Sequence, residues 1–185
     1  IARDPIVPVI SPTNPRRAYF YYQPQLTASV GSQMQTDSIY VNDRWRLGAC
    51  LADDMGLGKT IQALCLLLQQ KEQDGHEHLP TLLIAPTSVV TNWEREAARF
   101  APSLRVLVHQ GISRRKGEDL LAVVGNYDLI VTSYALLRMD IETLKEVNWR
   151  NVILDEAQNI KNPDARQSQA ARKLQDLGCR CCVIT

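Results

Sequence analysis

The sequence has no long hydrophobic run and almost no excess charge. No apolar stretch among its 185 residues approaches the roughly 20 residues that a membrane-spanning helix requires. No charged-then-apolar leader stands at its beginning, so we expect neither a signal peptide nor a membrane partner. Lysine and arginine number 21 against 20 aspartate and glutamate, a net charge of +1. This balance excludes a polybasic nucleic-acid binder, so any nucleic-acid contact has to come from local side chains and backbone N–H groups.

A second cysteine pair, which a structural zinc site usually needs, is also missing. Three of the five cysteines stand together as C-x-C-C at 179–182, while Cys50 and Cys65 each stand alone in the sequence. Structural zinc sites usually take four ligands in two closely spaced pairs, so this distribution disfavours a zinc site. We expect the cysteines to be reduced and buried, acting as small hydrophobic side chains in a cytoplasmic protein.

The chain divides into two parts of different character. Residues 1–47 contain five of the nine prolines and show no helical period, which predicts an irregular, proline-rich N-terminal arm. From residue 48 onward, short apolar runs alternate with amphipathic stretches. The runs are apolar at consecutive positions, as in strands buried on both faces of a parallel sheet. They lie at 48–53, 81–86, 104–109, 128–133, 151–156 and 180–185.

Helical patterns occupy the intervals between these runs, at 60–73, 88–100, 113–124, 141–147 and 165–177. Ser88 and Ser113 are expected to cap two of the helices, and Gly178 to end the last. The apolar period predicts two core-facing sets, Ile61, Leu64, Cys65 and Leu68, and Val89, Trp93, Ala97 and Phe100. The alternation predicts an α/β domain at 48–185, whose mostly parallel sheet is flanked by helices and binds its ligand at the carboxyl ends of the strands.

A glycine-rich loop follows the first run but lacks one glycine of the common phosphate-binding pattern, G-x-x-x-x-G-K-[ST]. In ADDMGLGKT, Asp53 stands in place of the first glycine. Backbone N–H groups and the helix macrodipole still favour a phosphate at such a strand-to-helix loop. Lys59 is placed to reach the β- and γ-phosphates, and the Thr60 hydroxyl to hold Mg²⁺. The alternative is a plain glycine-rich turn, in which the lysine charge would oppose the macrodipole.

Two carboxylates end the fifth run, where Asp155 and Glu156 follow the apolar residues 152–154. A carboxylate at the end of a buried strand is costly unless it has a partner or a chemical role. Asp155 suits the Mg²⁺ shell, and Glu156 suits a base that orients or deprotonates an attacking water. The alternative is a solvated acidic turn. Combined with the lysine loop, the pair predicts a site where a nucleotide is bound and hydrolysed.

With these motifs the sequence resembles the Snf2 family, a branch of the superfamily 2 helicase-like ATPases that move along double-stranded DNA. The resemblance covers about residues 48–185. It is carried by LADDMGLGKTIQAL, LLIAPTSVVTNWEREAARFAP, YDLIVTSYALL and VILDEAQNIKN, which correspond to motifs I, Ia, Ib and II. The DEAQ and NIKN spellings resemble the bacterial Snf2-like branch. The resemblance implies a RecA-like P-loop NTPase lobe, the first of two lobes that hold ATP and Mg²⁺ between them.

The resemblance also assigns the nucleotide site residue by residue. Lys59, Asp155 and Glu156 would be catalytic, with Thr60 and Asp155 on Mg²⁺. Gln158 would also couple the site to the neighbouring motifs. The nucleotide itself would be bound by Asp54, Met55, Gly56, Leu57, Gly58, Lys59, Thr60 and Gln158. In the N-terminal arm, Tyr22 and Gln23 only faintly match the family's adenine-reading pair, because Pro24 follows them.

The DNA contacts implied by the resemblance follow the second and fourth runs, at Pro86, Thr87, Thr132, Ser133 and Tyr134. Helix N-termini and hydroxyls there can donate to DNA phosphates. For Thr132 and Ser133, hydroxyls that cap their own backbone are an equal alternative.

The function that the resemblance implies is that of the first ATPase lobe of a double-stranded DNA translocase that remodels DNA-bound protein complexes. Such a protein would be cytoplasmic, associated with the nucleoid in a bacterium or nuclear in a eukaryote. The sequence stops before motif III, so we expect the second lobe and its arginine fingers beyond residue 185 of the same polypeptide. Two alternatives stay open, an RNA or DNA helicase of another superfamily 2 branch and a catalytically inactive interaction module.

Overall fold

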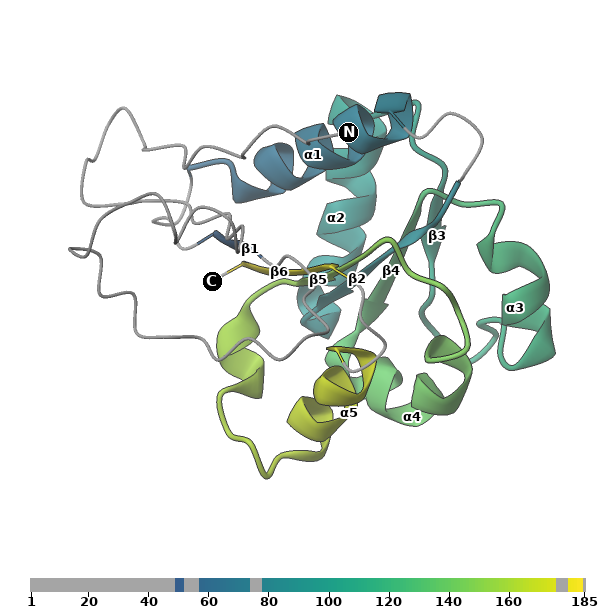
Figure 1. Ribbon diagram of the computed structural model, residues 1–185, viewed down its shortest axis with the longest axis vertical. Coiled ribbons are helices and arrows are strands. Elements are labelled where there is room, and N and C mark those ends of the chain that lie inside the picture. The colour runs from purple at the N-terminus through teal and green to yellow at the C-terminus, as the bar shows by residue number, and fades with distance from the viewer. Residues whose placement is uncertain (1–48, 52–56, 74–77, 176–179, 185) are drawn as a thin grey trace, which may run out of the picture.

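The computed structural model describes residues 49–51, 57–73, 78–175 and 180–184 (Figure 1). The predicted N-terminal arm, residues 52–56 of the predicted phosphate loop and Gly178 lie outside the described residues. None of the described helices is long and apolar enough to cross a membrane.

The described strands form one six-stranded sheet in which every pairing is parallel. The strand order is β1-β6-β5-β2-β4-β3. Since all strands run the same way, their carboxyl ends lie along one edge, as the sequence pattern predicts. The strands are β1 Ala49–Leu51, β2 Thr81–Ala85, β3 Val106–Val108, β4 Leu129–Ser133, β5 Asn151–Leu154 and β6 Arg180–Ile184.

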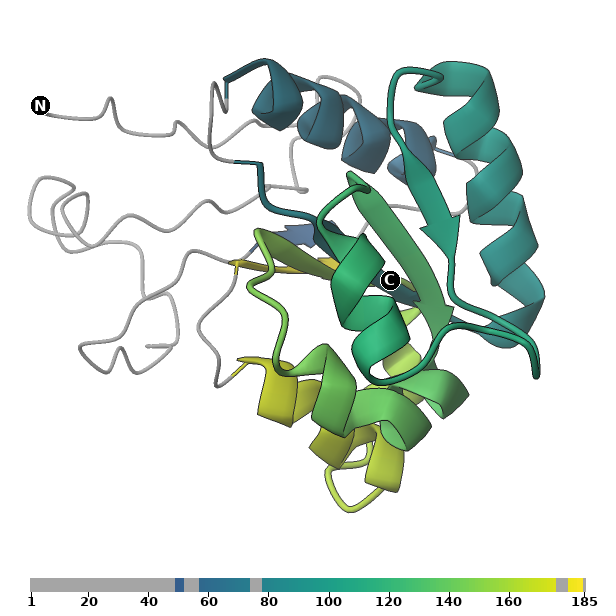
Figure 2. The same ribbon diagram turned by 90° about the vertical axis from the view of Figure 1, so that its right-hand side faces the viewer.

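Helices cover both faces of the sheet. Helices α1 and α2 lie on one face, and α3, α4 and α5 on the other (Figures 1 and 2). Because side chains alternate along a strand, β2 sends Leu82 and Ile84 into one core and Leu83 and Ala85 into the other. The helical elements are α1 Lys59–Gln73, α2 Thr87–Phe100, α3 Glu118–Val124, α4 Tyr134–Leu144, α5 Arg166–Gln175 and the 3₁₀ turn η1 Ala157–Ile160.

The buried faces of the first two helices differ from the predicted ones by about one residue. On α1 the buried hydrophobic side chains are Ala63, Leu64 and Leu67. Ile61 is exposed, and Cys65 is an exposed free thiol, which corrects the expectation that it is buried. On α2, Trp93 and Ala97 are buried as predicted, but Val90 is the fully buried valine and Phe100 is exposed.

Both predicted serine caps are wrong. Ser88 lies inside α2, whose N-cap is Pro86 without a side-chain cap bond. Helix α3 begins at Glu118 after Gly117, several residues later than Ser113. The residues between β3 and α3 form a loop. In this loop Gly111 and Gly117 have φ of 84° and 50°, backbone angles that favour glycine.

Helix α4 begins at Tyr134, earlier than the predicted residue 141, and it directly continues β4. The Ser133 side chain caps it by accepting a hydrogen bond from the Leu136 backbone N–H, 3.3 Å away. Asp140 has non-helical angles inside the helix, which marks a kink.

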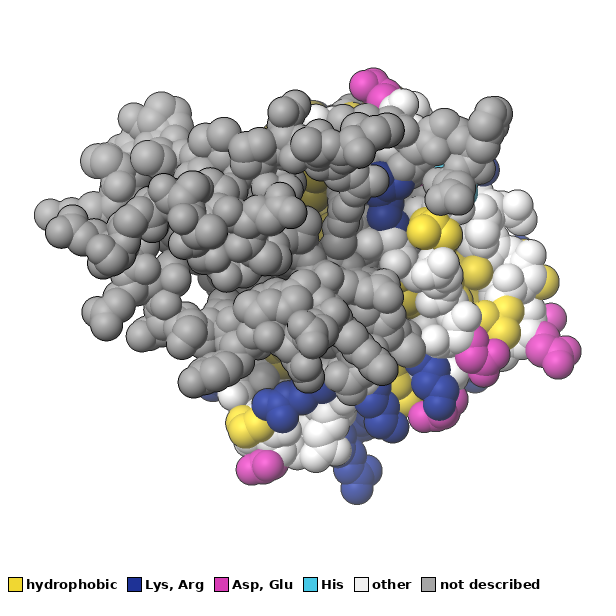
Figure 3. All heavy atoms as spheres, viewed as in Figure 1, with side chains coloured by type: hydrophobic (Ala, Val, Ile, Leu, Met, Phe, Trp, Pro, Cys, Tyr) yellow, Lys and Arg dark blue, Asp and Glu magenta, His cyan; other side chains and the backbone are white. Residues whose placement is uncertain are grey.

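On the surface, basic side chains gather over the lower part of the view in Figure 3. The exposed basic residues on and before α5 are Lys161, Arg166, Arg172 and Lys173.

Candidate nucleotide site

The N-terminus of α1 forms one side of the candidate site. Gly58 has φ of 75°, in the left-handed region where a Cβ would be strained, so a glycine is needed at this turn. The turn is held by Gln62, whose backbone N–H donates to the Gly58 oxygen at 3.0 Å and whose side chain donates to the Leu57 oxygen at 3.1 Å. Lys59 and Thr60, both partly buried, therefore stand in the first turn of a helix whose N–H groups point toward this edge.

Asp155 lies at the same edge, directly after β5. Its side chain is buried, and both of its carboxylate oxygens accept hydrogen bonds. The Trp93 indole N–H donates to Oδ2 at 2.6 Å, and the Glu156 backbone N–H donates to Oδ1 at 2.9 Å. Burial raises the pKa of Asp155, while the Trp93 bond, the Glu156 N–H and the Lys59 charge act in the opposite direction. The lysine of α1 and the carboxylate after β5 are thus close enough to interact electrostatically across the intervening β6.

Glu156 has an unusual backbone conformation, with φ of 50° and ψ of 51°. It is the only described non-glycine residue with a positive φ. The turn is held by Asn159, whose side chain donates to the Glu156 oxygen at 2.8 Å, and the Gln158 amide donates to the Glu156 carboxylate. Left-handed backbone at a residue with a Cβ is characteristic of functional sites. The conformation turns the chain sharply at the strand end, next to Asp155.

The donor set fits Mg²⁺ carried by a nucleotide. Among the described residues, no group of three His, Cys, Asp or Glu side chains could hold a metal ion by itself. A single carboxylate and a hydroxyl are nevertheless what Mg²⁺ uses when substrate phosphates and waters supply its remaining ligands. Asp155 and Thr60 would provide that pair, and each Asp155 oxygen has a lone pair beyond the hydrogen bond that it accepts.

The residues predicted to contact DNA follow two neighbouring strands, because β2 and β4 pair directly with Ala85 opposite Ser133. Pro86 and Thr87 begin α2 at the surface. Thr132, Ser133 and Tyr134 are buried, and their hydroxyls already bond within the chain. Thr132 donates to the His109 oxygen at 3.1 Å, Ser133 caps α4, and Tyr134 donates to the Asp155 oxygen at 2.7 Å. Their contact with DNA stays a prediction.

A buried polar network lies beside these residues, after β3. His109 Nε2 is 2.9 Å from Asp140 Oδ2, and Arg114 donates to both Asp140 oxygens, at 2.7 and 3.0 Å. Burial alone would raise the pKa of Asp140, but the bonds from Arg114 and His109 lower it. The network ties the loop after β3 to the kink of α4, which is why α3 begins late.

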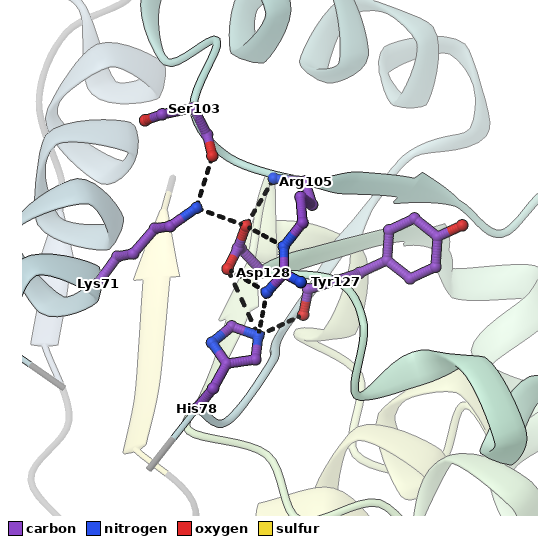
Figure 4. A network of polar contacts seen from close by, with 6 residues as sticks. All are labelled: Lys71, His78, Ser103, Arg105, Tyr127 and Asp128. Atoms are coloured by element: carbon purple, nitrogen blue, oxygen red, sulfur yellow. Dashed lines mark hydrogen bonds and ion pairs between the residues drawn. The ribbon is translucent and has the colours of Figure 1, made fainter. Parts of the chain in front are cut away.

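A second cluster, shown in Figure 4, lies at the opposite edge of the sheet, before β2 and β4. Asp128 accepts from the Arg105 backbone N–H at 2.6 Å and from Lys71 at 2.9 Å, and His78 lies 3.4 Å away. Burial would raise the pKa of Asp128, but the Arg105 and Lys71 bonds prevail and hold it at about 2. This cluster joins the end of α1 to the strands and faces away from the nucleotide edge.

Two side chains that contact Asp155 are not assigned to the nucleotide site by the sequence patterns. Trp93 reads as an ordinary core residue, and Tyr134 belongs to the predicted DNA-contacting segment. The signal for Trp93 is its polar N–H, since a buried indole usually finds a hydrogen-bond partner. Its partner is 62 positions away along the chain, so only the fold shows which one it is.

Comparisons with known proteins agree with this architecture. The family model of the SNF2-related domain matches residues 37–183. A Bacillus subtilis protein with the provisional name ATP-dependent helicase/translocase YwqA is 54% identical over 130 residues. These residues cover 70% of this chain and 14% of that protein. Helicase SWR1 of Eremothecium gossypii is 41% identical over 138 residues, covering 72% of this chain and 9% of that protein.

A solved structure supports the same assignment. It is the SWI2/SNF2 ATPase core of Sulfolobus solfataricus in complex with double-stranded DNA, with a TM-score of 0.61 and 40% identity. The match covers 75% of this chain and 27% of that one. This chain therefore spans only a small part of the relatives it matches. The matched family model, the parallel sheet and the shared ATPase-core fold show that the chain belongs to the SNF2-related domain family, with a RecA-like fold.

Proposed function

We propose that this chain is the first ATPase lobe of a DNA translocase that uses Mg²⁺ and ATP to move along double-stranded DNA and remodel DNA-bound protein complexes. The observation that carries the nucleotide part is that Lys59, in the first turn of α1, and the buried Asp155, directly after β5, lie at the same end of the sheet, where the strands finish. The helicase names of its relatives and the DNA-bound structure of a family member support the rest.

In the proposed mechanism, the first turn of α1 binds the phosphates through its backbone N–H groups and Lys59. Bound Mg²⁺ would neutralise charge on the transferred phosphoryl group, held on the protein side by Thr60 and Asp155. Glu156 accepts the proton of the attacking water or orients that water, and the Gln158 amide holds its carboxylate. Asp54, Met55 and Gly56 complete the proposed phosphate loop, although they lie outside the described residues.

Two substitutions in the full-length protein test these roles. Lys59→Ala is expected to abolish ATP binding, because it removes the cation that reaches the phosphates. Glu156→Gln is expected to keep binding and to lower kcat by about 10²–10⁴-fold, the usual contribution of a general base. ATP affinity by fluorescence titration and DNA-stimulated phosphate release measure the two effects.

The matched control is Glu94→Gln, which makes the same chemical change at an exposed position of α2. It should leave both affinity and turnover unchanged. Normal turnover in Glu156→Gln would remove Glu156 from its proposed role. A full-length protein that fails to bind ATP would favour the inactive interaction module, and unwinding of a tailed duplex, in place of triplex displacement, would favour another helicase branch.

A further inference from the structure

The Trp93 indole is buried in the core between α2 and the sheet, where it is 1% exposed. Its only polar atom, Nε1, donates to Asp155 Oδ2 at 2.6 Å. An indole N–H can only donate, so it fixes that oxygen as an acceptor. The ring cannot easily turn away because Trp93 is packed among apolar side chains in a close-packed core. The direction of the bond is therefore set by the packing of α2 against the sheet.

Tyr134 reaches Asp155 from the opposite face of the sheet. It is the first residue of α4, it is 4% exposed, and it packs in the other core. Its hydroxyl donates to the Asp155 backbone oxygen at 2.7 Å. The Asp155 backbone N–H donates in turn to the Ile84 oxygen of β2 at 2.8 Å. Residue 155 is thus held through its side chain, its carbonyl and its N–H by three different elements.

These bonds leave the carboxylate with a fixed plane. Oδ2 is held by the Trp93 indole and Oδ1 by the Glu156 backbone N–H, so rotation about the Cβ–Cγ bond would break both bonds. Each oxygen keeps a lone pair beyond the hydrogen bond that it accepts, and Asp155 lies at the same end of the sheet as Lys59 and Thr60. Mg²⁺ tolerates little deviation from octahedral geometry, so a carboxylate of fixed plane binds it better than a freely rotating one.

We propose that Trp93 and Tyr134 are positioning residues that hold the Asp155 carboxylate in the orientation required by nucleotide-bound Mg²⁺, one from each face of the sheet. The inference rests on the proposed function, because it takes Asp155 as a Mg²⁺ ligand. Hydrogen-bond partners of metal ligands commonly contribute 10–100-fold to metal affinity or activity. Trp93 acts directly on the carboxylate, and Tyr134 acts on the backbone that carries it.

The test compares two buried tryptophans whose indole N–H groups donate to different acceptors. Trp93→Phe removes the N–H and keeps an aromatic ring in the core. Trp149→Phe is the matched control, because Trp149 is 3% exposed and donates to a backbone oxygen, that of Leu144, at 2.7 Å. The readout is the Mg²⁺ concentration that gives half-maximal tight binding of a fluorescent ATP analogue to the full-length protein. Binding without Mg²⁺ serves as the check that each variant is folded.

We expect Trp93→Phe to need about 10-fold or more Mg²⁺ with unchanged Mg²⁺-free binding. Tyr134→Phe should shift the Mg²⁺ requirement in the same direction by less, and Trp149→Phe should not shift it. An unaltered Mg²⁺ requirement in Trp93→Phe, or an equal shift in Trp149→Phe, would overturn the inference.

The proposed function is tested separately by Asp155→Asn and the unaltered protein. If Mg²⁺ does not strengthen ATP binding to the unaltered protein, or if Asp155→Asn responds to Mg²⁺ normally, the assignment of Asp155 as a ligand fails. If both behave as proposed and only Trp93→Phe lacks its shift, Asp155 remains a ligand and the positioning role of Trp93 is lost.

Discussion

Asp128 shows how one carboxylate can hold several elements together. It lies just before β4 and accepts from Arg105, which precedes β3, and from Lys71 near the end of α1. These bonds outweigh the opposing effect of burial and hold its pKa at about 2, below the ordinary value of 3.8. Between these values the unfolded chain binds more protons than the folded chain. The stabilisation from Asp128 is therefore complete above about pH 4 and is lost as the pH falls toward 2.

The direction of this pH dependence leads to a prediction for Asp128→Asn. The variant should be less stable than the unaltered chain at pH 6, because Lys71 and Arg105 lose a charged partner. The difference should shrink as the pH is lowered from about 4 to about 2, because Asp128 of the unaltered chain is protonated first in the unfolded state and, below about pH 2, in both states. Urea unfolding over a pH series measures it. Glu94→Gln should show a small difference with no such pH dependence. A constant difference for Asp128→Asn would refute the prediction.

At the scale of single residues, sequence patterns locate the candidate site well but not its supports. Lys59 and Thr60 begin α1, and Asp155 and Glu156 directly follow β5, as the alternation of runs predicts, while their chemical roles stay predictions. The patterns do not reveal that Trp93 bonds to Asp155. Hydrophobic periodicity reports which face of a helix is buried, and it contains no information about where a buried N–H finds its acceptor.

At the scale of elements, β4 and α4 form one continuous unit with no loop between them. Ser133 ends the strand and its side chain accepts a hydrogen bond at the N-terminus of the helix. The unaided helix N-terminus would leave backbone N–H groups without partners. The single hydroxyl thus fixes the point at which strand geometry changes to helix geometry, and Tyr134 follows immediately.

We predict that Ser133→Ala destabilises the chain by about 0.5–2 kcal/mol, the usual cost of removing a serine N-cap. The matched control is Ser113→Ala. Ser113 is exposed and lies outside α3, so this change should stay within about 0.5 kcal/mol. Free energies of unfolding from urea titrations compare the two variants. Equal effects at positions 133 and 113 would argue against the capping role.

Strands are more predictable than helix starts in this fold for a physical reason. Strands β2, β4 and β5 are buried on both faces, and all six strands lie in continuous apolar runs, so each predicted run contains the observed strand. The starts of α3 and α4 depend on contacts that are distant in sequence. The Arg114 side chain bonds to Asp140 of α4, and the apolar run of β4 continues into α4 without a break. Local patterns therefore place the start of α3 too early and the start of α4 too late.

At the scale of the whole molecule, the chain covers 27% of the solved Snf2 core that it resembles. The family resemblance leads us to expect arginine fingers on a second lobe, outside the matched segment. Loss of such an arginine typically lowers phosphoryl-transfer rates by about 10³–10⁵-fold. We therefore predict that residues 1–185 alone bind Mg-ATP weakly and hydrolyse it negligibly. Phosphate release with and without double-stranded DNA measures this, and rapid DNA-stimulated turnover by the 185-residue chain would contradict it.

The position of β1 has a consequence for the order in which the molecule can assemble during synthesis. In the described sheet β1 is an edge strand that pairs only with β6, with Ala49 opposite Cys182. The pairings of β2 with β4 and of β4 with β3 involve no residue beyond 133, so they can form as soon as residue 133 has left the ribosome. The partner of β1, strand β6, is complete only at residue 184, so we expect the part of the sheet that carries the predicted DNA-contacting residues to form before the proposed nucleotide site is complete.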